Sequence, residues 1–368
     1  MLAAALPYYN RHVCDILEQT YALRKQTGRY LVWQNMPEFR SGNDWTEPSS
    51  VEKIGNWTAA FSKPAARWIA MGEAYFFLGF FDPFPAMPLL IKRALRTGKK
   101  VYVATEGLKH NNRAALRRSI LRPLRGYANG TLLAMGSGCV DDFRALGFDW
   151  SALNFGYAEK ALKSVPHSLG EEASEAGNRP LRLLAVGQLI SRKRYEWLVE
   201  FIAKLSHTLP IELRICGTGV EEERLRDIVA ALAAPVELMG FCAPDRLARQ
   251  YEWADIFIHP AEYEGWGVVL NHALSFGLPI LAGTGVRSAN GILVRDNWNG
   301  FTCATDQEYE AAVRKLHVDL AFRKQCISNS EALGFTWSVP EIARRLALDL
   351  DGHEGRYEVN EPMAKLSI

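Results

Sequence analysis

A carboxylate stands at the start of a glycine-rich loop within residues 260–280, between a short apolar run and an amphipathic stretch. The apolar run, residues 256–258, predicts a buried strand, and the stretch that ends at Gly277 predicts a helix. The first turn of such a helix offers free backbone N–H groups and the positive end of the helix dipole to an anion. Glu264 would lie beside that anion, where it could bind hydroxyl groups. A phosphate and a polyol held side by side describe a nucleotide sugar.

A second loop that could do chemistry, residues 187–194, follows a predicted strand and contains Arg192, Lys193 and Arg194. When a nucleoside diphosphate leaves, negative charge develops on it, and a fixed cation lowers the barrier. Lys193 is the first candidate, and Arg192 or Arg194 could supply a second charge. The alternative is a basic turn that is only solvated. With Glu264 downstream, we favour the catalytic interpretation for Lys193.

These two loops resemble those of the retaining glycosyltransferases of family 4, which have two Rossmann-like domains in the GT-B fold. The family signature is Glu-Gly-Phe-Gly, four residues, Glu-Ala, and then a Gly and a Pro. The positions that match are Glu264, Gly265, Gly267, Ala273, Gly277 and Pro279. Trp266 replaces the Phe, and His272 replaces the second Glu, which usually binds the ribose. His272 could still form that hydrogen bond; a histidine packed in the core is the equal alternative.

The resemblance implies a donor site built from these loops and from the glycines after the next predicted strand. Its residues are Gly187, Arg192, Lys193, Gly217, Gly219, Glu264, Gly265, Trp266, Gly267 and His272. Within this set, Lys193 would stabilise the leaving diphosphate and Glu264 would position the sugar, with no cofactor and no metal required. A third catalytic candidate, Glu106, ends a predicted strand, where it could orient an acceptor hydroxyl or act as a base. The alternative for Glu106 is an ion pair with a neighbouring Lys or Arg.

The composition fits a two-domain globular protein. The chain has 368 residues, of which 48% are hydrophobic and 23% charged, and this suits two domains of ordinary size. The six cysteines are scattered without a Cys-x-x-Cys pair, which argues against structural zinc. No apolar run is long enough to span a bilayer, and no secretory signal is evident. We therefore expect a cytoplasmic protein, which could also lie at the inner face of the cytoplasmic membrane.

The order of predicted elements indicates an α/β fold. In the C-terminal half, strands at 182–186, 211–216, 236–239 and 256–259 alternate with helices at 195–206, 221–232 and 244–251. Taken with the resemblance, this pattern predicts two Rossmann-like domains that face each other across a cleft, with the C-terminal helix crossing back. We place the acceptor-side domain at 1–163, a linker at 164–180, the nucleotide-sugar domain at 181–335, and the final helix and tail at 336–368.

Positive charge is concentrated in the first 165 residues, whereas the remainder of the chain is net negative. A basic, partly apolar stretch predicts a helix that could dock on anionic lipid or on a lipid-diphosphate acceptor. Its candidate residues are Arg113, Arg117, Arg118, Arg122 and Arg125. A solvated helix face is the alternative. No nucleic-acid motif accompanies the charge, so we do not expect nucleic acid as a partner.

The resemblance implies a retaining transferase of the hexosyltransferase class, which moves a sugar from a nucleotide diphosphate sugar to a hydroxyl of a lipid-linked or saccharide acceptor. Bacterial cell-surface polysaccharide or lipopolysaccharide biosynthesis is the usual setting. Two alternatives remain open from the residues alone: a nucleotide-sugar epimerase of the same fold, and a non-catalytic nucleotide-binding subunit.

Overall fold

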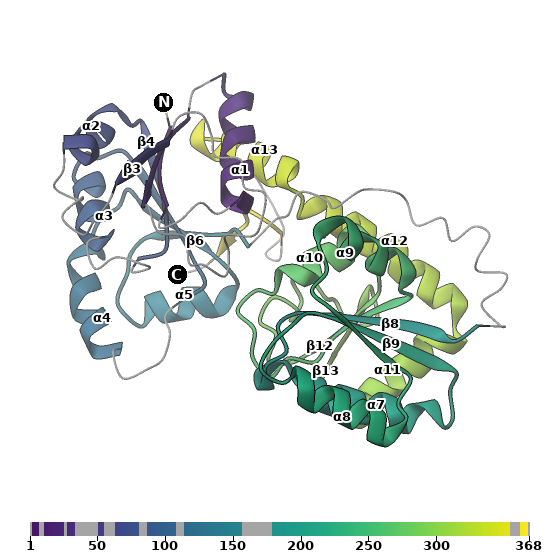
Figure 1. Cartoon of the computed structure of the whole chain (residues 1–368). Helices are drawn as coiled ribbons and strands as arrows, with labels where there is room; N and C mark the ends of the chain where they lie inside the picture. The colour runs from purple at the N-terminus through teal and green to yellow at the C-terminus, as the bar shows by residue number, and fades with distance from the viewer. Residues whose placement is uncertain are drawn as a thin grey trace. The chain divides into compact units, whose positions relative to one another are not determined.

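The computed structural model describes residues 2–6, 11–25, 28–33, 51–54, 63–80, 87–107, 114–156, 179–353 and 361–366. The chain forms two compact units, one of Met1–Ala158 with Val339–Ile368 and one of Glu159–Ser338 (Figure 1). Most of the predicted linker lies outside the described residues. No helix in the described part of the chain is both long enough and apolar enough to cross a membrane.

The N-terminal unit is built on an eight-stranded sheet in the order β14-β7-β6-β5-β4-β1-β2-β3. Its strands are β1 (Leu2–Leu6), β2 (Gly28–Trp33), β3 (Val51–Ile54), β4 (Ala74–Leu78), β5 (Lys100–Thr105), β6 (Gly130–Ala134), β7 (Ser151–Asn154) and β14 (Lys365–Leu366). Its helices are α1 (Arg11–Leu23), α2 (Lys63–Met71), α3 (Met87–Leu95), α4 (Ala114–Leu121), α5 (Ser137–Arg144) and α13 (Val339–Leu350), with a 3-10 turn η3 (Arg122–Leu124). Strand β4 is buried along its whole length, as its unbroken apolar sequence predicts for a central parallel strand.

The C-terminal segment returns to the N-terminal unit, as predicted. Helix α13 packs along α1, where the Thr20 hydroxyl donates to the backbone carbonyl of Ala343 at 3.3 Å. The Tyr102 hydroxyl, from β5, donates to the Asp349 carboxylate at 2.6 Å. Beyond the helix, β14 pairs antiparallel with β7, the one antiparallel pairing among the described strands. The end of the chain is thus part of the N-terminal sheet.

The C-terminal unit is a six-stranded parallel sheet in the order β10-β9-β8-β11-β12-β13. The strands are β8 (Leu181–Val186), β9 (Ile211–Cys216), β10 (Val236–Gly240), β11 (Ile256–His259), β12 (Ile280–Gly283) and β13 (Gly300–Cys303). The helices are α7 (Tyr195–Ser206), α8 (Glu222–Leu232), α9 (Pro244–Trp253), α10 (Val268–Ser275), α11 (Asp306–Val318) and α12 (Leu320–Thr336), with a 3-10 turn η4 (Ser191–Lys193). Helices α7, α8 and α11 cover one face and α9, α10 and α12 the other (Figure 1). Ligands of such sheets bind beyond the carboxyl ends of the strands.

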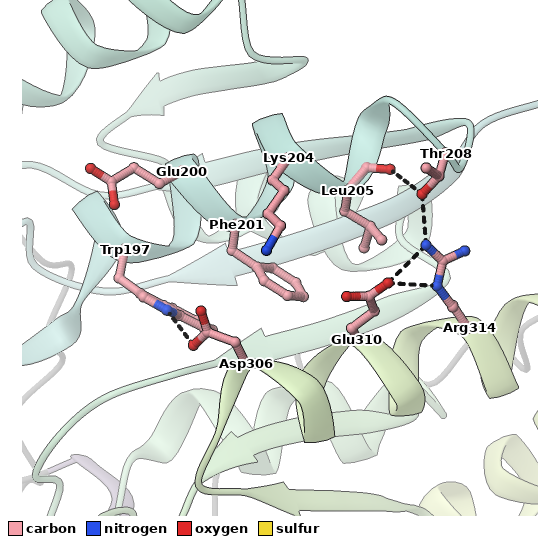
Figure 2. A pocket seen from close by; sticks show the side chains of 9 residues that line it. All are labelled: Trp197, Glu200, Phe201, Lys204, Leu205, Thr208, Asp306, Glu310 and Arg314. Atoms are coloured by element: carbon pink, nitrogen blue, oxygen red, sulfur yellow. Dashed lines mark hydrogen bonds and ion pairs between the residues drawn. The ribbon is translucent and has the colours of Figure 1, made fainter.

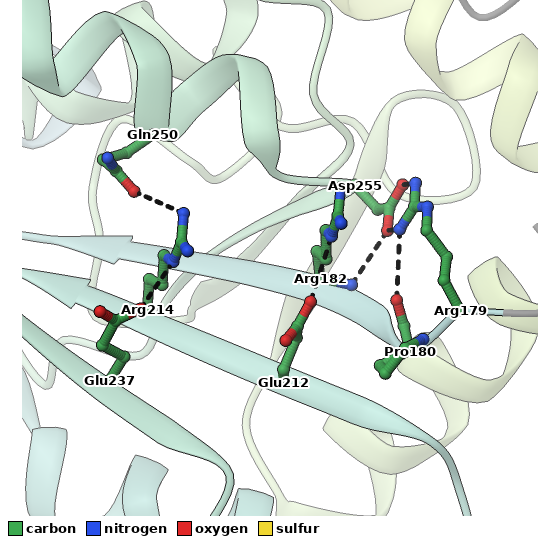
Figure 3. A network of polar contacts seen from close by, with 8 residues as sticks. All are labelled: Arg179, Pro180, Arg182, Glu212, Arg214, Glu237, Gln250 and Asp255. Atoms are coloured by element: carbon green, nitrogen blue, oxygen red, sulfur yellow. Dashed lines mark hydrogen bonds and ion pairs between the residues drawn. The ribbon is translucent and has the colours of Figure 1, made fainter. Parts of the chain in front are cut away.

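Charged and polar side chains connect neighbouring strands of this sheet (Figure 3). The buried Asp255 carboxylate, just before β11, accepts two hydrogen bonds from Arg179, at 2.7 and 2.8 Å, and one from the backbone N–H of Arg182 at 2.9 Å. Arg214 reaches Glu237 at 3.0 Å. The Asp255 contacts lie at the amino-terminal ends of β8 and β11, remote from the loops that follow these strands.

Candidate active site at the carboxyl ends of β8 and β11

Glu264 is held in place by its backbone. Its N–H donates to the carbonyl of Gly285 at 3.2 Å, and its own carbonyl accepts from the N–H of Arg287 at 3.0 Å. Helix α10 begins directly after Gly267, its N-cap residue, whose left-handed φ of +77° favours glycine. A Cβ at Gly267 would lie 3.1 Å from the Glu264 Cγ. Gly267 therefore makes the turn into the helix and also leaves room for the carboxylate.

The two loops predicted from the sequence meet in one cluster. The Lys193 ammonium, at the end of η4, forms an ion pair with the Glu264 carboxylate. Arg192 donates to the same carboxylate oxygen at 3.1 Å and to the carbonyl of Tyr263 at 2.8 Å. In return, the N–H of Glu262 donates to the Arg192 carbonyl at 2.8 Å. The loop after β8 is thus joined to the loop after β11 through backbone and side chain.

A histidine that the sequence reasoning missed completes the cluster. His259 ends β11 and is fully buried. Its Nε2 lies 3.5 Å from the Lys193 Nζ and 3.8 Å from a Glu264 carboxylate oxygen. Only its place as the last residue of the strand, where ligand-facing side chains gather, could have indicated it.

The charges in the cluster favour binding of an anion. Burial alone would raise the pKa of Glu264, but the contact with His259 and the charges of Lys193 and Arg192 outweigh it and hold that pKa well below its ordinary value. Burial lowers the pKa of Lys193, and the Glu264 carboxylate offsets only part of this change. Two basic side chains therefore face one ionised carboxylate, next to the N-terminus of α10.

The predicted donor-site glycines allow the strand-end loops to pack closely. A Cβ at Gly217 would lie 1.8 Å from the carbonyl oxygen of Gly187, and a Cβ at Gly219 would lie 2.3 Å from that of Leu189. Both contacts are with backbone, so they cannot be relieved by a side-chain rotation. The glycines thus bring the loops after β8 and β9 together; whether they also approach a nucleotide stays a prediction.

Trp266 and His272 lie in the interior of the unit. The Trp266 side chain is buried, packs on Trp337 and donates to the Asn271 side chain at 2.8 Å, and its contact with the donor stays a prediction. The indole supports the start of α10. His272 is buried in edge-to-face contact with Tyr251 of α9, with ring centroids 5.7 Å apart. This position favours the core interpretation, and a ribose contact stays a prediction.

The remaining predicted residues lie in the N-terminal unit. Glu106 is exposed immediately after β5. Arg113 lies outside the described residues. The prediction of a single helix for the basic stretch is wrong, because α4 ends at Leu121 and Pro123 continues the chain as the 3-10 turn η3. Among the residues that the structure describes, no three His, Cys, Asp or Glu side chains gather as a metal site would require.

A cavity of about 380 Å³ lies elsewhere in the C-terminal unit, between α7 and α11 (Figure 2). The Trp197 ring in its wall is stacked on Phe201 and has the Arg194 guanidinium 4.6 Å from its centroid. Its indole N–H donates to Asp306 at 2.9 Å. Because these groups already satisfy one another, and no residue of the Lys193 cluster lines the cavity, it is separate from the candidate site.

Solved structures with a similar architecture define the fold class of this protein. HepE of Anabaena, in complex with UDP, superposes with a TM-score of 0.71 over 96% of this chain and 100% of that chain, at 15% identity. The lipopolysaccharide outer core galactosyltransferase WaaB superposes with a TM-score of 0.67 over 92% of this chain and 98% of that chain, at 14% identity. The chain therefore has the GT-B fold, with two Rossmann-like domains.

A family model matches the sequence of the C-terminal unit. Residues 171–332, which make up most of this unit, match the model of the family glycosyl transferases group 1. A curated relative is the GtfA subunit of the UDP-N-acetylglucosamine–peptide N-acetylglucosaminyltransferase of Streptococcus pneumoniae. It is 28% identical over 139 residues, which cover 37% of this chain and 27% of the relative. The matched segments span about a quarter to two fifths of the length of the curated relatives.

Buried His259 predicts a dependence of stability on pH. Burial lowers its pKa below the ordinary value of 6.5, so the unfolded chain takes up a proton at this side chain before the folded protein does. Its contribution to stability should be complete above about pH 6.5 and be lost as the pH falls, by at most about 1.4 kcal/mol per pH unit. We expect His259→Gln to have a smaller drop in Tm between pH 7.5 and 5.5 than the wild type.

Two features of the chain help to isolate this effect. His317, whose pKa burial also lowers, is present in both proteins and cancels in the comparison. His207→Gln, at an exposed position, is the matched control and should keep the pH slope of the wild type. Equal slopes for His259→Gln and the wild type would contradict the interpretation.

Proposed function

We propose that this protein is a retaining glycosyltransferase of the hexosyltransferase class, which transfers a sugar from a nucleotide diphosphate sugar to a hydroxyl acceptor. The observation that carries the proposal is the joining of Lys193, Arg192 and Glu264 at the carboxyl ends of two neighbouring strands, inside a glycosyl transferases group 1 domain. The cluster lies beside the N-terminus of α10, where backbone N–H groups and the helix dipole add to its attraction for phosphate.

The chemistry follows from the charges. Lys193 and Arg192 neutralise the negative charge that develops on the departing diphosphate, so the leaving group needs no metal ion. Glu264, kept ionised by its basic neighbours, accepts hydrogen bonds from the sugar hydroxyls. The carboxylate and the ammonium pair with each other, so donor binding must exchange part of this ion pair for contacts with phosphate. The departing phosphate takes the proton of the incoming hydroxyl on the same face of the sugar, which retains the configuration.

The names of similar proteins support the donor class. HepE was solved with UDP, and the GtfA subunit belongs to an enzyme named for UDP-N-acetylglucosamine. WaaB is named as a lipopolysaccharide galactosyltransferase, and this favours lipopolysaccharide or another cell-surface polysaccharide as the setting. We propose a saccharide or lipid-linked acceptor, a cytoplasmic location, and Glu106 as the residue that orients the acceptor hydroxyl.

A thermal-shift panel of UDP-, GDP- and ADP-sugars tests the donor site. A ligand at one hundred times its dissociation constant adds about 2.7 kcal/mol to the free energy of unfolding, which is readily measured. Donor consumption is then assayed with and without acceptor extract, because an epimerase would convert the donor alone and a non-catalytic subunit would not consume it. Failure of every nucleotide to stabilise the protein would contradict the proposal.

The basic stretch of the N-terminal unit is proposed to bind an anionic membrane. Leu116 and Ile120 are exposed on α4, and Arg117 and Arg118 lie between them in the sequence. Each arginine near an anionic surface contributes about 1 kcal/mol. Replacing Arg118, Arg122 and Arg125 with serine should therefore weaken binding by about a hundredfold.

Flotation with phosphatidylglycerol vesicles measures this loss, and phosphatidylcholine vesicles give the uncharged reference. A variant in which Arg226, Arg246 and Arg249 of the C-terminal unit are changed to serine removes the same charge from another surface and should float as the wild type does. Unchanged flotation of the variant at Arg118, Arg122 and Arg125 would contradict the proposed membrane contact.

A further inference from the structure

A tyrosine hydroxyl is buried next to the Lys193 ammonium. Tyr195 is the first residue of α7, two residues after Lys193, and its side chain is fully buried. The Cβ that a larger residue would have at Gly187 lies 2.7 Å from the Tyr195 hydroxyl oxygen and 3.7 Å from the Lys193 Nζ. The hydroxyl and the ammonium thus converge on the same point of the backbone, at the carboxyl end of β8.

Among the residues that the structure describes, this hydroxyl has no hydrogen-bond partner. A buried polar group without a partner is rare in folded proteins, because it has lost its hydration and gained nothing in return. Burial, and after it the charge of Glu264, raise the pKa of Tyr195, so the hydroxyl keeps its proton and remains a donor. The missing partner is therefore an acceptor.

The neighbours of the hydroxyl indicate the chemistry of that acceptor. An oxygen that contacts both a tyrosine O–H and a lysine ammonium is stabilised most when it carries negative charge. Glu264 already neutralises part of the Lys193 charge, but it forms no hydrogen bond with Tyr195. Gly187, on which both groups converge, belongs to the loop that we assign to the leaving diphosphate.

We propose that Tyr195 is a further binding residue of the donor site, whose hydroxyl donates a hydrogen bond to a phosphate oxygen held by Lys193. The inference rests on the proposed function and adds to it a residue that recognises phosphate without carrying charge. A buried water molecule as the partner is the competing explanation, and the two differ in what happens when the hydroxyl is removed.

Tyr195→Phe removes only the hydroxyl and keeps the packed ring. In the free protein we expect an unchanged or higher Tm, because a buried group without a partner has been deleted. Calorimetric titration with UDP, GDP and ADP should show at least about a tenfold weaker affinity for whichever of them the wild type binds, as expected for a hydrogen bond to a charged group. Inorganic pyrophosphate should lose affinity in the same proportion.

Tyr309→Phe is the matched control. Tyr309, on α11, is equally buried, and its hydroxyl also has no partner among the described residues, but it packs on Trp197 and Phe201 and not on the Lys193 cluster. This variant should bind nucleotide as the wild type does.

The outcomes separate the inference from the function on which it rests. If the wild type binds none of the three nucleotides, the proposed donor site is wrong and the role of Tyr195 is overturned with it. If the wild type binds and Tyr195→Phe binds equally well, only the role of Tyr195 is overturned, and water is its partner. An equal loss in Tyr309→Phe would also overturn it, because the effect would then not depend on the position of the hydroxyl.

Discussion

Replacing Lys193 with methionine is expected to lower the rate of sugar transfer by about 10²–10³-fold, the usual effect of removing one fixed donor from a site where negative charge develops. Methionine keeps the apolar stem that is buried beside β8 but carries no charge. Arg192 remains, but its side chain is more exposed than that of Lys193 and is directed to the carbonyl of Tyr263. Turnover of the nucleotide sugar that stabilises the wild type measures the loss.

The same substitution should destabilise the folded protein, because it leaves the Glu264 carboxylate with one cation fewer. Breaking a fully buried ion pair typically costs about 3–5 kcal/mol. The loss of stability should be smaller here, since Arg192 still contacts the carboxylate. Combining Lys193→Met with Glu264→Gln should recover part of the stability, because both charges are then gone. It should recover none of the activity. The second substitution should thus raise stability without restoring catalysis.

Two results would contradict this account. Lys193→Met with nearly the turnover of the wild type would show that the diphosphate is neutralised elsewhere. A double variant no more stable than Lys193→Met would show that the ion pair is not what couples the two loops. Lys193→Arg, which keeps the charge on a longer and planar group, should retain more activity than Lys193→Met.

The sequence predicted the C-terminal unit well because its elements are short, buried and regularly spaced. The predicted strand 211–216 and helix 195–206 have the bounds of β9 and α7. The prediction was poorer where tertiary contacts decide the structure. Strand β14 is only two residues long and forms because it pairs with β7, which nothing local indicates. The end of α4 could have been predicted, because Pro123 cannot continue a helix from the preceding turn.

Within the site, too, local patterns predicted some residues, whereas others depend on tertiary contacts. Lys193 and Glu264 were predicted from charge and glycine spacing, and the structure brings them into contact. His259 was missed because a histidine that ends an apolar strand looks like a core residue, and Tyr195 because it looks like an ordinary first residue of a helix. Only three-dimensional proximity distinguishes them. Trp266 was assigned to the donor by its place in the motif, although an indole of that size is more often buried, as it is here.

Gly217→Ala is expected to destabilise the C-terminal unit by about 3 kcal/mol or more, at or above the upper end of ordinary overpacking. The added Cβ would lie 1.8 Å from the carbonyl oxygen of Gly187, so one of the two backbones must move. Both are held by the sheet, because the N–H of Gly187 donates to Cys216 at 2.9 Å and that of Gly217 to Gly240 at 2.8 Å. For a domain of this size, Tm should fall by about 6–12 °C.

Gly240→Ala separates the clash from backbone strain. Gly240 has a left-handed φ of +65°, but a Cβ there would meet no atom within 4 Å. Alanine at this position should lower stability only by about 1–2 kcal/mol, the cost of placing a Cβ-bearing residue in the left-handed conformation. If Gly217 is instead needed so that a nucleotide can approach the backbone, Gly217→Ala will keep the Tm of the wild type and lose UDP, GDP or ADP binding. A large loss of Tm therefore assigns this glycine to the packing that holds the Lys193 loop, and an unchanged Tm with lost binding assigns it to the ligand.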